Sequence, residues 1–127
     1  MTTFDDGMAL RRQVLGDAHV DRSMNGASEF SAPLQEWATG SGWGAVWTRP
    51  GLDLRTRSLL TLVMLTALGR MHEFAVHVRG AVRNGCTEVE IREALLQSAL
   101  YCGAPAALES VRVAERVLGE LAAEAQA

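Results

Sequence analysis

The chain has 127 residues, of which 48% are hydrophobic and 21% are charged, and its formal net charge is −3. This length supports one hydrophobic core, so we expect residues 1–127 to form a single domain. The weak negative charge argues against a nucleic-acid partner, because nucleic-acid-binding domains present concentrated positive charge. All twelve basic residues are arginine, so no lysine is available to form an imine with a substrate.

The cysteines and the first residues of the chain favour a cytoplasmic location. Cys86 and Cys102 lie sixteen positions apart, which fits neither a redox Cys-x-x-Cys motif nor a zinc site. The first residues are acidic and lack the apolar segment of a secretory signal. The longest apolar run, residues 59–68, is about half of what a membrane span needs, so we expect no membrane partner.

Apolar residues recur at helical spacing, and no run alternates as in a half-buried strand, which predicts an all-α fold of about six helices. The first helix is expected over residues 4–15, ending at Gly16. Residues 16–23 are polar and are expected to form a turn-like connection. The second helix is expected over residues 29–39, ending at the glycine-rich stretch 40–44.

Four more helices are expected in the rest of the chain. They cover residues 54–68, 70–84, 88–101 and 105–121. The helix over 54–68 is apolar on nearly every face, and because a small domain cannot bury such a helix alone, we expect a subunit interface there. Thr87 and Glu90 have the spacing of a capping box, which marks the start of the following helix. Residues 122–127 are expected to fray.

The expected helix over 70–84 carries the most reactive side chains. Arg70, Glu73 and His77 fall on one helical face, at positions i, i+3 and i+7. A carboxylate one turn from an imidazole can fix its tautomer and raise its basicity, so Glu73 and His77 are a candidate general acid–base pair. The same spacing occurs in ordinary surface pairs. It also fits two ligands of a metal site whose third ligand is missing from this helix.

Tryptophans and arginines lie close to these residues in the sequence. Trp43 and Trp47 are four positions apart, with Trp37 nearby. Core or interface packing is their commonest role, and the wall of an apolar pocket is the alternative. Five arginines accompany them: Arg49, Arg55, Arg57, Arg70 and Arg79. Most are expected on the solvated surface or in salt bridges, whereas a substrate with two carboxylates needs about two guanidinium groups.

Five motifs in a fixed order resemble those of the carboxymuconolactone decarboxylase family. They lie at residues 11–21, 43–52, 55–59, 73–85 and 97–107. The motif at 73–85 contains Glu73-x-x-x-His77 and ends at Asn84-Gly85. The motif at 11–21 resembles the 4-carboxymuconolactone decarboxylases rather than the wider family. The resemblance extends over nearly the whole chain.

The resemblance implies an alkylhydroperoxidase-like helical fold, assembled as a homo-oligomer (a trimer or a hexamer) without cofactor or metal. The implied enzyme is a carboxy-lyase that acts on a small lactone carboxylate. It converts 4-carboxymuconolactone to 3-oxoadipate enol-lactone in the catabolism of protocatechuate, an aromatic acid, by the β-ketoadipate pathway. Alkylhydroperoxidase-like proteins carry Cys-x-x-Cys ahead of the histidine. This chain has Arg70 and Glu73 at those positions, so thiol-based peroxide reduction is disfavoured.

The resemblance also leads to expected roles for individual residues. His77 is the expected proton donor or oxyanion partner, and Glu73 acts either on the substrate or only on the tautomer of His77. The expected substrate-binding residues are Arg49, Arg57, Arg70 and Trp47.

Two alternatives to this function stay open. The same scaffold can hold a related decarboxylase or lactone-processing enzyme of secondary metabolism, with specificity changed at positions such as Phe74 and Arg79. The chain can also be a non-enzymatic oligomer that binds a small acid, since no obligatory cofactor motif argues against that class.

Overall fold

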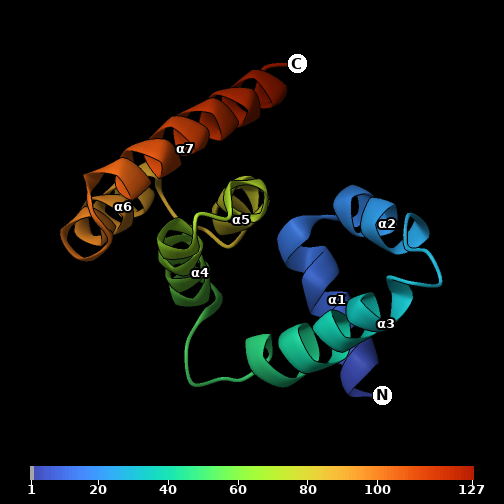
Figure 1. The fold of residues 1–127 in the computed structure, drawn as a ribbon. Coiled ribbons are helices and arrows are strands. Elements are labelled where there is room, and N and C mark those ends of the chain that lie inside the picture. Colours follow the sequence, from blue (N-terminus) through green and yellow to red (C-terminus); the bar gives the residue numbers. More distant parts are fainter. Residues whose placement is uncertain (1) are drawn as a thin grey trace. The chain divides into compact units, whose positions relative to one another are not determined.

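The computed structural model describes residues 2–127, and in this range the chain forms helices and no strand (Figure 1). The predicted all-α fold is confirmed. Residues 2–127 contain seven α-helices and one π-helical segment, η1. Their bounds are α1 Thr3–Leu15, α2 Asp17–Asn25, α3 Ala32–Trp37, η1 Ala38–Trp47, α4 Leu54–Leu68, α5 Met71–Arg83, α6 Glu88–Cys102 and α7 Ala104–Ala125.

The chain divides into two compact units, Met1–Leu54 and Arg55–Ala127. The first unit contains α1, α2, α3 and η1, and the second contains α4 to α7 apart from the first residue of α4. Each unit has buried side chains of its own. That residues 1–127 act as one domain stays a prediction.

In the first unit, α1 and η1 pack backbone to backbone. Gly7 of α1 and Gly44 of η1 are both buried at this contact. A Cβ on Gly7 would overlap the carbonyl oxygen of Thr39 and lie 2.6 Å from the amide nitrogen of Gly44. A Cβ on Gly44 would likewise overlap the backbone of Thr3. No larger residue allows this approach, so the two glycines set the spacing between α1 and η1.

A buried arginine also joins these two elements. Arg11 of α1 is 7% exposed, and its Nη1 donates a hydrogen bond to Oγ1 of Thr39 at 3.1 Å. The Thr39 hydroxyl in turn donates to the carbonyl oxygen of Gln35 at 2.8 Å. A buried guanidinium is tolerated only when such partners replace water, so this chain of hydrogen bonds fixes η1 against α1.

The prediction of a turn-like connection over residues 16–23 is wrong, because α2 begins at Asp17. Arg12 of α1 forms ion pairs with Asp17 at 3.1 Å and with Asp21 at 2.9 Å. Val20, between them, is fully buried. The polar residues therefore lie on the outer face of a helix that packs through Val20. The polar composition of this stretch favours a turn, so it did not indicate the helix.

The predicted helix end at residues 40–44 is also wrong. The chain continues from α3 directly into η1, which extends to Trp47. The low helix propensity of glycine is offset here because Gly44 is needed for close packing against α1. The second helix was expected from residue 29, but α3 begins at Ala32.

In the second unit, one face of each helix contributes to a common core. The cluster of buried residues consists of Leu62, Phe74, Val78, Ala81, Cys86, Ile91, Leu95, Ala114 and Val117. The long helix α7 packs against both α5 and α6, and Figure 1 shows it running beside α6. A buried hydrogen bond of 2.7 Å joins the hydroxyls of Thr66 in α4 and Ser110 in α7.

The helix bounds of this unit follow the sequence closely. The bounds predicted for α4 are confirmed, and α6 begins with the predicted capping box. In it, the Thr87 hydroxyl accepts from the Glu90 amide at 3.1 Å, and the Glu90 carboxylate accepts from the Thr87 amide at 2.9 Å. Gly103, with φ of 94°, separates α6 from α7 as expected.

The end of α7 differs from the prediction of fraying. The helix continues to Ala125 instead of ending near residue 121. Arg79 of α5 holds this last part, because its guanidinium pairs with Glu120 at 3.0 Å and with Glu124 at 2.9 Å. An ion pair between two helices cannot be read from the local composition of the tail.

Candidate active site

The helix α5 positions the predicted acid–base residues. Phe74, Val78 and Ala81 are fully buried in the core and fix the rotation of α5 about its axis. His77 lies between Phe74 and Val78 in sequence and is half-buried, with its Nδ1 atom out of solvent. An imidazole held in this way keeps a defined orientation, which acid–base catalysis requires.

Glu73 stands one turn before His77, in the first turn of α5, and is exposed. Arg70 directly precedes the helix and is exposed as well. The three residues therefore share one helix and its start, and the direct Glu73–His77 contact stays a prediction.

The remaining predicted site residues come from other elements. Arg57 lies in the first half of α4, is half-buried, and has its Nε atom out of solvent. Arg49 follows η1 and is exposed. Trp47, the last residue of η1, is half-buried. Arg57, Arg70, Glu73 and His77 thus belong to the second compact unit, whereas Trp47 and Arg49 belong to the first.

The tryptophans differ in their surroundings. Trp43 is 8% exposed, and the rings of Trp43 and Trp47 stack with centroids 4.6 Å apart and an angle of 25° between their planes. Trp37 is 65% exposed. The expectation of core packing is therefore confirmed for Trp43 but not for Trp37. The role of Trp47 as a pocket wall stays a prediction.

Two of the flanking arginines form ion pairs within the chain, as expected for most of them. Arg55 pairs with Glu90, and Arg79 pairs with Glu120 and Glu124. The hydrogen bond that Arg79 donates to the Glu124 carboxylate raises the pKa of the Arg79 guanidinium above its ordinary value. These contacts give Arg79 a structural role between α5 and α7.

Phe74 was suggested above as a position where specificity could change. Its side chain is fully buried within the core cluster of the second unit. It packs against core residues and does not present a surface to a ligand, so that suggestion is wrong.

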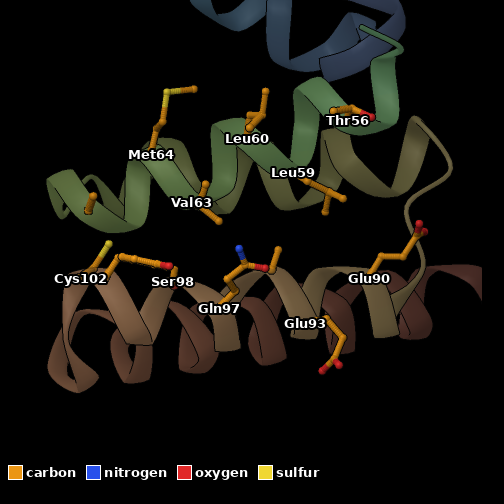
Figure 2. A pocket seen from close by; sticks show the side chains of 13 residues that line it. Thr56, Leu59, Leu60, Val63, Met64, Glu90, Glu93, Gln97, Ser98 and Cys102 are labelled. Atoms are coloured by element: carbon orange, nitrogen blue, oxygen red, sulfur yellow. The ribbon is translucent and has the colours of Figure 1, made fainter.

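A groove of about 600 Å³, which was not predicted from the sequence, lies between α4 and α6 (Figure 2). Its lining is mostly apolar and consists of Thr56, Leu59, Leu60, Val63, Met64, Ala67, Glu90, Glu93, Ala94, Gln97, Ser98, Tyr101 and Cys102. None of the predicted site residues is in this lining, and no arginine is. The available signal was the apolar character of α4 on nearly every face, which was interpreted as a subunit interface.

Residues 2–127 contain neither a cluster of metal-ligating side chains nor a membrane-spanning helix. No group of three or more His, Cys, Asp and Glu side chains in this range is placed to hold a metal ion. No helix in the same range is long and apolar enough to cross a membrane. The cysteines differ in access, since Cys86 is buried and Cys102 is exposed.

The helical fold and the Glu73-x-x-x-His77 motif on α5 agree with a comparison to known families. Residues 32–116 match the carboxymuconolactone decarboxylase family, so the chain belongs to this family of decarboxylases. The predicted resemblance is thereby confirmed.

Two relatives cover most of the chain. The nitrosuccinic acid decarboxylase of Metarhizium robertsii is 43% identical over 118 residues, which are 93% of this chain and 82% of the relative. The 4-carboxymuconolactone decarboxylase of Acinetobacter baylyi is 40% identical over 118 residues, covering 93% of this chain and 88% of the relative. A 4-carboxymuconolactone decarboxylase of Pseudomonas putida is 50% identical over 36 residues, 28% of this chain. These relatives are carboxy-lyases with different named substrates.

Proposed function

We propose that this chain is a cofactor-free carboxy-lyase whose substrate is 4-carboxymuconolactone. The observation that supports this most is the 40% identity, over 93% of this chain, to a decarboxylase named for that substrate. The product would be 3-oxoadipate enol-lactone, as in the breakdown of protocatechuate. The proposal makes the residues of α5 and their neighbours the reaction site.

The chemistry of the substrate explains why no cofactor is needed. The carboxylate stands on the γ-carbon of the lactone, which is conjugated through the ring double bond to the lactone carbonyl. When the carbon–carbon bond to CO2 breaks, the electron pair spreads onto the carbonyl oxygen and forms a dienolate. A proton then adds to a ring carbon. The substrate supplies its own electron sink, so the protein must only orient the carboxylate, stabilise the oxyanion and deliver the proton.

Nitrosuccinic acid is the second candidate substrate, because the relative named for it is 43% identical over the same share of this chain. Loss of the carboxylate from the nitro-bearing carbon would place the electron pair on the nitro group as a nitronate. Protonation of that carbon would complete the reaction. Both candidate acids thus carry at least one carboxylate beside a built-in electron sink. The proposal at its broadest is decarboxylation of a small acid of this kind.

In this mechanism His77 donates the proton or stabilises the oxyanion. Support comes from its half-buried position and from the packing of Phe74 and Val78, which holds α5 in one orientation. Glu73 sets the tautomer of His77 once the two side chains meet, or acts directly on the substrate. The first role is possible because residues four apart on a helix are neighbours on its surface.

The proposed carboxylate-binding residues are Arg57, Arg70 and Arg49. A planar guanidinium can bind a carboxylate through two parallel hydrogen bonds, and it keeps its charge at every relevant pH. Arg57 is the most constrained of the three because it is half-buried in α4. Trp47 supplies an apolar surface that keeps water from the departing carboxylate.

Discrimination between the two acids is the direct test. Purified full-length protein is given 4-carboxymuconolactone and nitrosuccinic acid in separate reactions, and the products are followed by NMR while CO2 is collected. We expect the enol-lactone from the first acid with a kcat/KM of at least about 10⁴ M⁻¹s⁻¹, a usual value for a cognate substrate. A kcat/KM more than about tenfold higher for nitrosuccinic acid than for 4-carboxymuconolactone would show that nitrosuccinic acid is the preferred substrate.

A further inference from the structure

The helix α5 ends in a Schellman motif. The amide of Cys86 donates a hydrogen bond to the carbonyl oxygen of Ala81 at 2.9 Å. The amide of Gly85 donates to the carbonyl oxygen of Val82 at 3.0 Å. Gly85 has a φ of 90°, in the left-handed region that favours glycine. The chain therefore leaves α5 by a defined turn, which sets where Asn84 and Cys86 lie.

This turn contacts the first two turns of α4. The Asn84 side-chain amide donates a hydrogen bond to Oγ of Ser58 at 2.9 Å. The Cys86 thiol donates to the carbonyl oxygen of Arg55 at 3.5 Å, and a Cβ on Gly85 would lie 3.6 Å from Cδ of Arg55. Ser58 is fully buried, whereas Asn84 is half-buried. The Asn84 amide therefore supplies the Ser58 hydroxyl with a donor in place of water.

Ser58 directly follows Arg57, the most constrained of the proposed carboxylate-binding residues. Successive residues of an α-helix point about 100° apart, so a fixed Ser58 also fixes the direction in which Arg57 leaves α4. The Arg57 side chain is half-buried, with its Nε atom out of solvent. A guanidinium held in this way loses less conformational freedom when it binds a carboxylate.

Asn84 also lies on the face of α5 that carries His77. The two residues are seven positions apart, which is about two helical turns, and Gly80 between them is buried. The Asn84–Ser58 bond thus connects the helix of the proposed proton donor to the helix that carries Arg57. One substrate molecule must meet both groups, so a contact that fixes Arg57 relative to α5 affects how well the acid binds.

We propose that Asn84 is a positioning residue of the reaction site, which acts through Ser58 to hold Arg57 in place for a substrate carboxylate. This inference rests on the proposed function, in which Arg57 binds that carboxylate. A carboxylate of the substrate gains no charge as the bond to CO2 breaks. A guanidinium that holds it therefore contributes more to substrate binding than to the rate of bond cleavage. Loss of the positioning contact should raise KM and leave kcat nearly unchanged.

The test compares KM and kcat of Asn84→Ala with those of the wild type, using the better of the two candidate acids. We expect KM to rise about tenfold and kcat to stay within about threefold of the wild-type value. Ser58→Ala removes the same bond from the α4 side and should give the same change. Ser110→Ala is the matched control, because it removes a buried hydrogen bond of 2.7 Å to Thr66, near the other end of α4. It should lower stability but keep the wild-type KM.

Combination with Arg57→Ala shows whether Asn84 acts through Arg57. Asn84→Ala should add little to the KM of Arg57→Ala, because the side chain that Asn84 positions is then already absent. A purely structural role of Asn84 would instead lower the fraction of folded enzyme, and with it the apparent kcat, at an unchanged KM. The proposal is overturned by an unchanged KM in Asn84→Ala. It is also overturned if Asn84→Ala raises KM by the same factor with and without Arg57.

A chemical measurement that needs no substrate separates this inference from the proposed function. Phenylglyoxal modifies accessible guanidinium groups, and peptide mass spectrometry gives the rate at each arginine. Arg57 should be modified at least about threefold faster in Asn84→Ala than in the wild type. The exposed Arg70 should react equally fast in both. An unchanged rate at Arg57 would overturn the inference even if an acid is decarboxylated. If the wild type decarboxylates neither acid, the proposed function fails, whereas the rate at Arg57 still decides whether Asn84 holds that side chain.

Discussion

His77 combines two properties that a proton donor needs. Its ring is half-buried with Nδ1 out of solvent, and its neighbours Phe74 and Val78 anchor α5 in the core. The other histidine of this helix, His72, is exposed in the first turn. The two side chains therefore offer a direct comparison between a held and a solvated imidazole on the same helix.

His77→Ala should lower turnover about a hundredfold or more, because the proton would have to come from water. Helical content and assembly should stay as in the wild type. His72→Ala is the matched control and should keep near-normal turnover. The rates are measured with the better of the two candidate acids. Near-normal turnover of His77→Ala would remove this residue from the mechanism.

Glu90 gives a prediction about pH. The hydrogen bond from Arg55 and the backbone amide of Thr87 lower the pKa of Glu90 from 4.5 to about 2. Because the folded-state pKa is the lower one, the ionised group stabilises the fold fully above about pH 4.5. This contribution is lost as the pH falls from about 4.5 to about 2. Glu90→Gln keeps the capping-box geometry but removes the charge.

The unfolding temperatures of the wild type and Glu90→Gln should therefore differ at pH 6 and converge as the pH approaches 2. Glu88→Gln, in the same first turn, removes a carboxylate without removing the Arg55 partner. That control should show no comparable convergence. If the unfolding temperatures of the wild type and Glu90→Gln differed by the same amount from pH 6 to pH 2, the lowered pKa of Glu90 would be contradicted.

At the scale of elements, the close contact between α1 and η1 is the place in the first unit where we expect a small substitution to lower stability most. Gly7→Ala would place a methyl group against the backbone of Thr39 and Gly44. The helices would have to separate, so we expect a loss of about 1–3 kcal/mol in the free energy of unfolding. Denaturant titration followed by tryptophan fluorescence measures it.

The control for this substitution is Gly40→Ala in η1, where a Cβ meets no atom within 4 Å. Alanine should be neutral there or raise stability by up to about 1 kcal/mol, because it favours helical backbone. Equal changes in the free energy of unfolding for the two substitutions would contradict this account, because the close contact at Gly7 would then have no effect of its own.

Elements determined by interactions between residues close in sequence could be predicted, whereas elements that depend on contacts with distant segments could not. The bounds of α4 and the capping box at Thr87 were predicted correctly because local periodicity and local hydrogen bonds determine them. The start of α2 and the continuation into η1 were not predicted. Both depend on contacts with α1, through the Arg12 ion pairs and the Gly7–Gly44 approach, which no local pattern reveals.

At the scale of the whole molecule, the sequence indicated the helix that carries Glu73 and His77 but not the full candidate site. Helical spacing placed Glu73 and His77 one turn apart on α5, and the structure has both on that helix. Spacing alone did not show that Arg79 is tied to α7. It also could not reveal the groove, which arises from the separation of α4 and α6.

The central claim is that the chain decarboxylates a small acid carrying its own electron sink, without help from a cofactor. CO2 release by full-length protein, after treatment with a chelator and dialysis, tests this most directly. We predict one CO2 per molecule of 4-carboxymuconolactone or nitrosuccinic acid consumed, at a rate that the chelator does not change. Failure of the folded protein to release CO2 from either acid, or loss of activity after chelation, would contradict the claim.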